Sequence, residues 1–230
     1  MVLQPDNINI LGYSGSHMAL IFETLSCLGF PGKVRIIMHD DTRYFDVPFE
    51  TGLSYSVIKQ SDLNSIPEGA FFFCSNNPAN KTFLFSFFAR KWELKESAFA
   101  SIVHPSSVIA STVKHKQGLY IEPLSVISAY TTVGFGVSIN RHCSVGHHNV
   151  LHDYCSIYPG SHLAGDVKIG RAATIGPGTT VFSGVAIGEN TIVGGGSVVT
   201  KDIPANILAF GNPCRVIKEL EQNRDQTIIK

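Results

Sequence analysis

The chain has 230 residues, enough to bury a sizeable core, and its 18 basic residues balance 18 acidic ones. A balanced charge offers no broad field to attract nucleic acid or an anionic membrane, so we expect neither as a partner. We expect a cytoplasmic protein, since no apolar run approaches the roughly 20 residues of a spanning helix and the N-terminus lacks a signal-peptide pattern. The five scattered cysteines predict buried thiols in a reducing compartment.

The first hundred residues alternate strand-like and helix-like segments. Short apolar runs predict strands, and apolar residues at helical spacing or a run opening at proline predict helices. In chain order the expected elements are a strand at 8–11, a helix at 18–30, strands at 33–41 and 70–77, and a helix at 78–92. This order predicts a small parallel, Rossmann-like α/β sheet as a domain over residues 1–100.

From about Ile102 the pattern changes to a period of six. An aliphatic residue stands at every sixth position, namely Val133, Ile139, Val145, Leu151, Ile157, Leu163, Ile169, Ile175, Val181, Ile187, Val193 and Val199. Neither a helix nor an ordinary strand has this period, which is the signature of a parallel β-helix. Three hexads form one triangular coil of 18 residues, with each aliphatic side chain pointing inward.

The same phase extends towards the N-terminus through Ile127 and Ile121. We expect a one-residue slip near "KHKQG" that brings Val108 and Ile102 into the inward column. Glycine follows several of the aliphatic residues, as at Gly146, and we expect it to relieve the backbone at the corners of the coil.

The 18-residue circuit makes a local prediction about the histidines in "VGHHNVLHDYCSIYPG". Residues 18 apart should lie one above the other, roughly 4.8 Å apart as in a sheet. The outward-facing His147 then stacks between Ala129 and Gly165, beside open space. Neighbours on a strand point to opposite sides, so we do not expect His147, His148 and His152 to share a metal ion, and we predict no metal site.

Several stretches in order resemble one known group. They are the turn "GYSGSH", the β-helix entry "HPSSVIASTV", a histidine mid-way, and the exit "IGENTIVGGGSVVTKDIPANILAFGNPCRVIKE". Together they resemble the hexapeptide-repeat, left-handed β-helix acyltransferases. Within these, the chain looks like the bacterial nucleotide-amino-sugar N-acetyltransferases of bacillosamine and perosamine type and their sialic acid O-acetyltransferase relatives. The resemblance implies a left-handed β-helix acetyltransferase domain with a C-terminal tail over 101–230, a nucleotide-sugar domain over 1–100, and a homotrimer.

The resemblance also implies roles for the mid-helix residues. His147 matches the general base, and the N–H of Gly165 matches the amide that steadies the thioester oxygen during direct acetyl transfer. Relatives usually have an acidic residue directly after the base, whereas here His148 follows it. Our hypothesis is that Asp166, one coil beyond His148, supplies the missing carboxylate to the pair.

Acetyl-CoA is the co-substrate that the resemblance implies. Pro177 and Gly195 match positions that contact it, and Lys201 is a candidate partner for its phosphates. Ser156 stands where some relatives place a histidine against the thioester region, and its hydroxyl could serve there more weakly.

The N-terminal turn is the expected site for the nucleotide-linked sugar. Gly12, Ser14 and Gly15 match the relatives' glycine-rich loop, whereas Ser16 replaces its histidine; glycines there let a backbone approach phosphate at a helix N-terminus. By resemblance, Asp40 and Asp41 recognise base and ribose and Asn140 enters from an adjacent subunit. Asn76 follows a strand at the edge where such sheets bind ligands.

The predicted activity is N-acetylation of a nucleotide-linked amino-sugar, such as a 4-amino-4,6-dideoxyhexose destined for lipopolysaccharide or a protein glycan. Two alternatives remain open. One is O-acetylation of a sugar hydroxyl, for which the loss of an acidic neighbour is a disadvantage because a hydroxyl is the poorer nucleophile. The other is a carbohydrate-binding β-helix without catalysis, to which His148, Ser156 and the altered loop would correspond.

Overall fold

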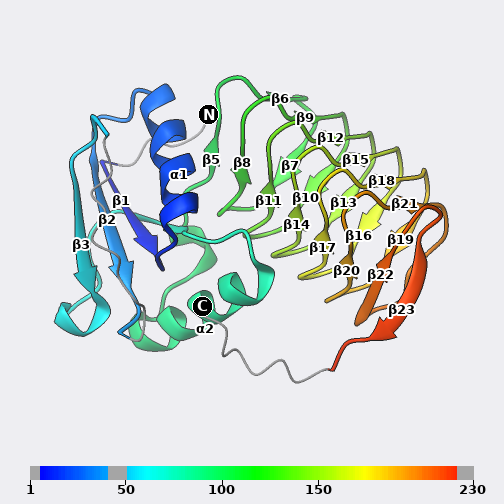
Figure 1. The fold of residues 1–230 in the computed structure, drawn as a ribbon. Coiled ribbons are helices and arrows are strands. Elements are labelled where there is room, and N and C mark those ends of the chain that lie inside the picture. Colours follow the sequence, from blue (N-terminus) through cyan, green and yellow to red (C-terminus); the bar gives the residue numbers. More distant parts are fainter. Residues whose placement is uncertain (1–5, 41–50, 222–230) are drawn as a thin grey trace.

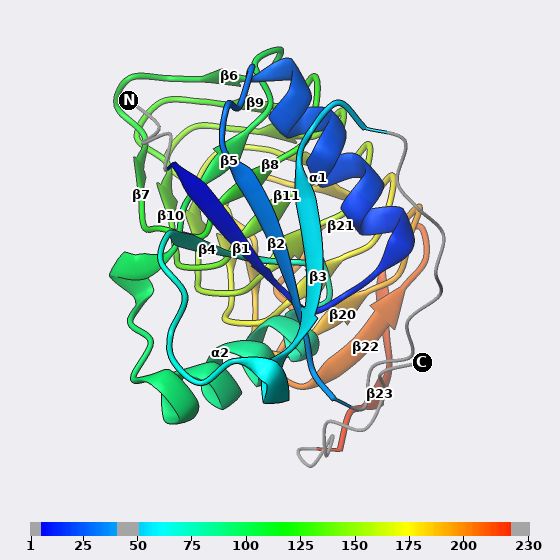
Figure 2. The ribbon, with the colours of Figure 1, turned by 90° about the vertical axis from the view of Figure 1, so that its left-hand side faces the viewer.

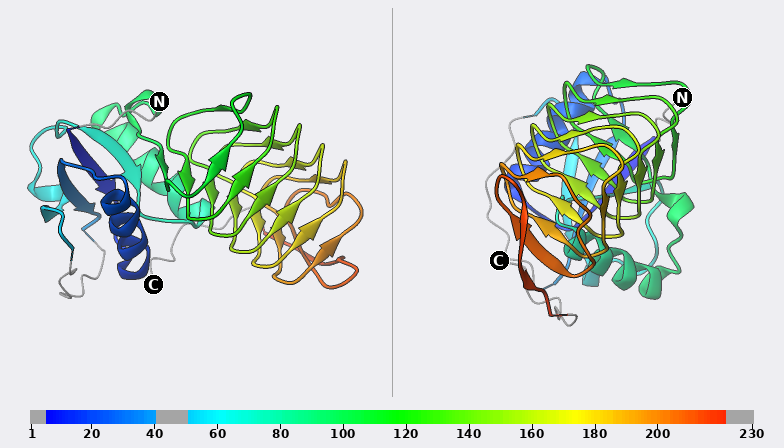
Figure 3. Two further views of the ribbon diagram at one scale, coloured as in Figure 1. Left: turned by 90° about the horizontal axis from the view of Figure 1, so that it is seen from above. Right: turned by 90° about the vertical axis from the view of Figure 1, so that its right-hand side faces the viewer.

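The computed structural model describes residues 6–40 and 51–221, and the expected substrate residue Asp41 lies outside them. A small sheet with two helices forms one end of the molecule, and a stack of triangular coils extends from it (Figure 1; Figure 3, left). No helix among the described residues is long and apolar enough to cross a membrane.

The predicted small parallel sheet is confirmed. Its strands lie in the order β3-β2-β1-β4 and pair in parallel. They are β1 (Asn7–Leu11), β2 (Lys33–Met38), β3 (Tyr55–Lys59) and β4 (Ala70–Phe73), with helices α1 (Gly15–Cys27) and α2 (Pro78–Trp92). Strand β3 was not predicted from the sequence, because polar and apolar residues alternate only weakly along it. Pro78 opens α2 as expected, and the side chain of Asn77 caps it by accepting from the N–H groups of Ala79 and Asn80.

The two helices cover opposite faces of this sheet (Figure 2). Along each strand, alternate side chains face α1 and α2, so that Ile10 packs with α1 and Leu11 with α2. Aromatic residues of the β-helix complete both layers, with Tyr120 on the α1 side and Phe135 on the α2 side. The sheet is therefore packed against the first coils.

Three parallel sheets form the sides of the β-helix, which is the predicted left-handed type (Figure 3, right). The first sheet contains β5 (Ile102–Val103), β8 (Tyr120–Ile121), β11 (Ser138–Ile139), β14 (Ser156–Ile157), β17 (Thr174–Ile175), β20 (Ile192–Val193), β22 (Ile207–Phe210) and the antiparallel β23 (Arg215–Glu219). The second contains β6 (Val108–Ile109), β9 (Val126–Ile127), β12 (Ser144–Val145), β15 (His162–Leu163), β18 (Thr180–Val181) and β21 (Val198–Val199). The third contains β7 (Lys114–His115), β10 (Thr132–Val133), β13 (Val150–Leu151), β16 (Lys168–Ile169) and β19 (Ala186–Ile187).

The inward column is as predicted from Ile121 onward. All twelve aliphatic residues from Val133 to Val199 are buried in one core. The expected slip near "KHKQG" is wrong, because Ile109 pairs with Ile127 at the unbroken spacing of 18 and Val108 points outward, 60% exposed. The dipeptide "VI" has an aliphatic residue in both orientations, so its phase could not be distinguished from the sequence. Likewise Val103 takes the inward position, and Ile102 is buried against the N-terminal sheet.

Glycine does not have the role that we expected for it at the corners of the coil, namely to relieve the backbone there. A Cβ on Gly146 would lie 2.5 Å from the carbonyl oxygen of Ala164 on the next coil, so glycine is needed there for close approach. The left-handed backbone comes two residues later, as at His148, whose φ is 57°. Many of these sixth positions hold residues other than glycine, including His142 and Asp166.

A buried lysine joins α2 to the first sheet of the β-helix. The ammonium of Lys81 donates to the carbonyl of Gly136 at 2.7 Å and to the hydroxyls of Ser138 and Ser156 at 3.0 and 3.1 Å. Burial lowers the pKa of Lys81 to about 7, because a charged group loses its hydration there.

This burial predicts a stability that depends on pH. Unfolding returns Lys81 to its ordinary pKa of 10.5, so between pH 7 and pH 10 the unfolded chain binds a proton that the folded chain has lost. The free energy of unfolding should therefore rise across this interval, by up to about 1.4 kcal/mol per pH unit. In urea denaturation, the difference between the wild-type protein and Lys81→Met should show this slope. A difference that stays constant from pH 7 to pH 10 would contradict the assignment.

Candidate active site

His147 and Gly165 lie together where the second sheet of the β-helix turns into the third; we call residues 146–149 and 164–167 the His147 corner. A Cβ on Gly165 would lie 2.5 Å from Cε1 and 2.7 Å from Nε2 of His147. The imidazole therefore rests on the bare Cα of Gly165, as the 18-residue spacing predicted. His147 is exposed, and the N–H of Gly165 donates to no acceptor among the described residues.

The neighbouring imidazole lies on the same side as His147. Nδ1 of His147 and Nδ1 of His148 are 3.0 Å apart, so one nitrogen donates to the other. The expectation that these side chains point to opposite sides is wrong, because His148 occupies the left-handed corner position and not a strand. Two residues 18 positions away flank its ring, as Tyr130 stacks on it with ring centroids 5.0 Å apart and Asp166 follows on the next coil.

The carboxylate of Asp166 completes the group of titratable side chains at this corner. One ligand atom each from His147, His148 and Asp166 lie within 4.8 Å of one another, and all three residues are exposed. Lys201 lies on the same edge of the stack, two residues after Val199 as His147 is two residues after Val145. Tyr130 was not among the residues predicted from the sequence, although its spacing of 18 from His148 was sufficient to find it.

Other predicted residues lie on a different corner, between the first and second sheets; we call residues 140–143, 176–179 and 194–197 the Pro177 corner. A Cβ on Gly195 would lie 2.9 Å from the carbonyl oxygen of Pro177, so these two are in contact and both are exposed. Asn140 belongs to this corner and is buried, and its Oδ1 has no partner among the described residues. Within one chain, Pro177 and Gly195 therefore do not meet His147.

Ser156 does not have the exposure that contact with a thioester requires. It is fully buried, its hydroxyl accepts from Lys81 and it donates to the carbonyl oxygen of Asn76 at 2.5 Å. The predicted contact with acetyl-CoA is therefore wrong for this arrangement of the chain. The reason is the docking of α2 over this part of the first sheet, which the hexad pattern does not reveal.

A second polar cluster lies where the N-terminal part meets the Pro177 corner. Glu122 is fully buried and accepts from Nη1 of the half-exposed Arg141 at 3.2 Å. Asn76 donates to Glu122 at 3.4 Å, and its own Oδ1 has no partner among the described residues. Asn76 thus faces the β-helix, and the sequence analysis had not selected Glu122 or Arg141.

The loop from β1 to α1 has the predicted strand-turn-helix form. Gly12 is buried with a φ of 89°, and a side chain there would press against Leu84 at 3.0 Å. Ser14 is the N-cap of α1 without a capping side-chain bond, and the N–H groups of Gly15 and Ser16 donate to no acceptor among the described residues. Free amides at a helix N-terminus favour an anion.

Two side chains near this loop already make contacts within the protein. His17 turns inward and packs its ring edge-on against Tyr120, and burial lowers the pKa of His17 to about 4. Asp40 is exposed after β2, and both its oxygens already accept hydrogen bonds, from the side chain of Gln60 and the backbone N–H of Ser61. Recognition of a base or ribose by Asp40 stays a prediction.

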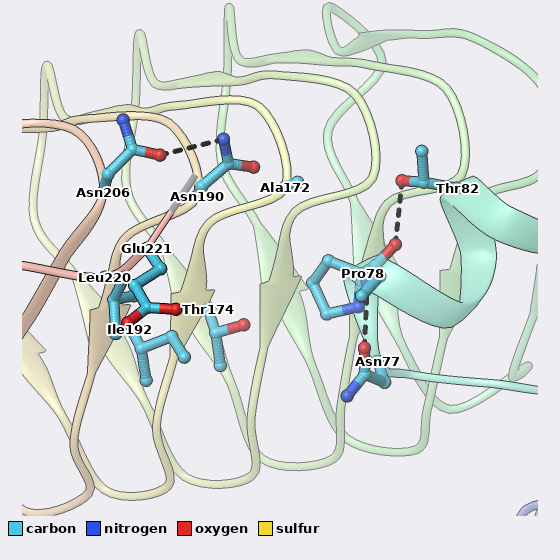
Figure 4. A pocket seen from close by; sticks show the side chains of 11 residues that line it. Asn77, Pro78, Thr82, Ala172, Thr174, Asn190, Ile192, Asn206, Leu220 and Glu221 are labelled. Atoms are coloured by element: carbon cyan, nitrogen blue, oxygen red, sulfur yellow. Dashed lines mark hydrogen bonds between the residues drawn. The ribbon is translucent and has the colours of Figure 1, made fainter. Parts of the chain in front are cut away.

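A hollow of about 210 Å³ lies at the remaining corner, between the start of α2 and the end of β23 (Figure 4). Its walls include Asn77, Thr174 and an Asn190–Asn206 pair joined by a hydrogen bond. Among the described residues that line it, Glu221 alone is acidic or basic, so the hollow offers one carboxylate but no imidazole and no cation. The His147 corner is open surface by comparison, but it has the reactive groups, and we base the candidate site on these groups.

Comparison with known proteins agrees with this fold. The family model described as bacterial transferase hexapeptide (six repeats) matches residues 150–183. Galactoside O-acetyltransferase from Escherichia coli (strain K12) is 41% identical over 106 residues, or 45% of this chain. The match spans 51% of that enzyme, about half its length.

Solved structures match over nearly the whole chain. The acetyltransferase domain of PglB from Neisseria gonorrhoeae FA1090, in complex with acetyl coenzyme A, has a TM-score of 0.79 at 23% identity, over 92% of this chain and 99% of that one. At that identity the likeness shows the fold alone. A mutant of perosamine N-acetyltransferase from Caulobacter crescentus, with CoA and GDP-perosamine, has a TM-score of 0.74 at 27% identity, over 93% and 97%. The predicted resemblance to hexapeptide-repeat acyltransferases is confirmed.

The contact between His147 and Gly165 predicts the effect of Gly165→Ala. The new methyl group would occupy space now held by the imidazole, and the ring, at the end of a flexible side chain, should move away. We expect destabilisation of only about 1 kcal/mol, the cost of an unfavourable rotamer, and a changed NMR signal for the Cε1–H of His147. In a His147→Ala background the same substitution should cost nothing. An unchanged His147 signal would contradict the contact, and Ser183→Ala on the following coil is the matched control.

Proposed function

We propose that the protein transfers an acetyl group from acetyl-CoA to the amino group of a nucleotide-linked amino-sugar, with His147 as general base. The observation that carries this proposal is the contact of an exposed imidazole with Gly165, whose N–H is free among the described residues. A base and an amide donor side by side are the two groups that acyl transfer from a thioester requires.

The proposed reaction needs no covalent enzyme intermediate. The sugar amine attacks the thioester carbonyl carbon, the carbonyl oxygen becomes an oxyanion, and the N–H of Gly165 donates to it. His147 accepts the proton that the amine loses, and the intermediate then expels the CoA sulfur, which takes up a proton. A fixed donor to an oxyanion contributes on the order of 3 kcal/mol, and general base catalysis about 10²- to 10⁴-fold in rate.

His148 and Asp166 are positioning residues in this proposal. If Nδ1 of His147 donates to Nδ1 of His148, the free lone pair of His147 lies on Nε2, the atom nearer Gly165. Stacking on Tyr130 fixes the plane of the His148 ring. The carboxylate of Asp166, within 4.8 Å, favours positive charge on this pair of imidazoles as the proton arrives.

The two corners support a site built from two subunits of a homotrimer. The His147 corner and the Pro177 corner flank the same second sheet, whose outer face exposes apolar residues such as Val108 and Val126. If three copies turn this sheet towards a common axis, the His147 corner of one chain lies beside the Pro177 corner of the next. Acetyl-CoA would then run along the groove between them, with Lys201 beyond Gly165 as a candidate phosphate partner.

The N-terminal part would supply the nucleotide site of the same groove. The free N–H groups at Gly15 and Ser16 suit a diphosphate. These amides precede His17, whose ring packs on Tyr120 of the first sheet. Arg141 belongs to the Pro177 corner, which follows the first sheet. The perosamine N-acetyltransferase with this fold binds GDP-perosamine, which supports a nucleotide-linked amino-sugar as the class of substrate.

O-acetylation of a sugar hydroxyl is the second candidate, favoured by the similarity to galactoside O-acetyltransferase over the β-helix repeats. That match covers about half of that enzyme's length. The N-terminal sheet with its anion-binding loop favours the nucleotide-linked substrate instead, because a free sugar has no phosphate for the loop to bind.

The proposed base predicts the outcome of an acetyl-transfer assay. Purified protein, acetyl-CoA and a panel of UDP-, dTDP- and GDP-linked amino-sugars should release CoA thiol, and His147→Ala should lower kcat by about 10²- to 10⁴-fold. His152→Ala, which replaces an exposed histidine outside both the His147 corner and the Pro177 corner, is the matched control. Release with free sugars alone would favour O-acetylation, and full activity of His147→Ala would refute the role of the base.

The shared site predicts complementation between inactive chains. Gly195→Trp should fill the Pro177 corner and, like His147→Ala, abolish activity in the homotrimer. Randomly assembled trimers from equal co-expression should together regain about a quarter of wild-type activity, because on average one site in four pairs an intact His147 corner with an intact Pro177 corner. No recovery in trimers verified to be mixed would mean that the site lies within one chain.

A further inference from the structure

The His147 corner has a second chemical property besides basicity. Two imidazoles and a carboxylate converge there with one ligand atom each within 4.8 Å of the other two, and all three side chains are exposed. Imidazole nitrogen and carboxylate oxygen are ligands that divalent ions of the cobalt-to-zinc range accept. The expectation of no metal site rested on opposite orientations of His147 and His148, which the structure does not have.

The spacing of the two imidazoles suits chelation. Their Nδ1 atoms are 3.0 Å apart. An ion about 2.05 Å from both nitrogens would make an N–ion–N angle of about 94°, close to the right angle of tetragonal sites with nitrogen and oxygen ligands, as Ni²⁺ prefers. The left-handed backbone at His148 already sets this spacing, so the ion does not have to bring the two imidazoles together.

The coil holds all three ligands in position. Tyr130 stacks on one face of His148, and His147 rests on Gly165. Asp166 is fixed at its backbone, where its N–H donates to the carbonyl oxygen of His147 at 2.9 Å. The exposed carboxylate can rotate towards the two imidazoles, and the fixed backbone lowers the cost of ordering the three ligands.

We propose that His147, His148 and Asp166 form a binding site for a divalent transition-metal ion such as Co²⁺, Ni²⁺ or Zn²⁺, and that the bound ion inhibits the enzyme. Binding follows from the geometry alone, whereas inhibition rests on the proposed function. A neutral imidazole has one nitrogen lone pair free. If an ion takes the lone pair of His147, the other nitrogen has a proton and cannot accept another from the substrate.

Direct binding tests the site independently of catalysis. Protein without a histidine tag, treated with a chelator, would be titrated with Co²⁺ by visible absorption and with Zn²⁺ by calorimetry. We expect one ion per chain at this corner. His148→Phe, which keeps the stack on Tyr130, and Asp166→Asn should each weaken binding by at least about tenfold, the loss that even an outer partner of a metal ligand causes. His152→Ala is the matched control, because His152 is exposed, lies outside both named corners and should leave binding unchanged.

Each outcome has a separate meaning. No saturable binding at millimolar ion, or binding that both variants leave intact, overturns the site. Loss of acetyl transfer on adding Zn²⁺, with recovery on adding chelator, supports inhibition, and faster transfer overturns it. Ion binding without acetyl transfer on any sugar would refute the proposed function and leave the metal site intact.

Discussion

The 18-residue circuit of the coil is the constraint on which the rest of the structure depends. Because parallel strands pair at this spacing, each residue lies over the one 18 positions later, and the stacked aliphatic side chains form one core. The same register acts on the outer surface, where it sets His147 against Gly165 and His148 between Tyr130 and Asp166. A packed apolar column therefore fixes polar side chains that have few contacts of their own, which is how a rigid scaffold supports an exposed site.

The corners add a second constraint that the period alone does not contain. Every sixth residue adopts the left-handed conformation there, and at His148 this turns two adjacent side chains to the same side. An arrangement of two imidazoles beside a carboxylate is thus a consequence of the corner. It gives His147, the proposed base, a neighbour that can accept a hydrogen bond.

The features that follow directly from the six-residue period were predicted correctly from the sequence. The errors lie where the phase is ambiguous, where the N-terminal part docks on the β-helix, or where the backbone turns a corner. The inward column and the His147–Gly165 contact follow from counting, and both are present. Val108 was misassigned because "VI" is aliphatic in both phases. Ser156 was misassigned because α2 and its buried Lys81 cover the first sheet, and docking between the two parts of a chain has no signature in a repeat. Adjacent histidines were misjudged by applying strand alternation to a corner.

In the proposed function, the division of the candidate residues between two corners leaves one coiled chain with an incomplete site. The inward column takes one aliphatic residue from each hexad, so the outer faces must interact with something else or remain exposed. On the first sheet that partner is the N-terminal part of the same chain, held by Lys81 and the aromatic layers. The second sheet has no such cover among the described residues, and it exposes Val108 and Val126 on its first two strands, β6 and β9. A second copy on that sheet would bury apolar surface and join base to groove in one step, so assembly and catalysis would depend on the same contact.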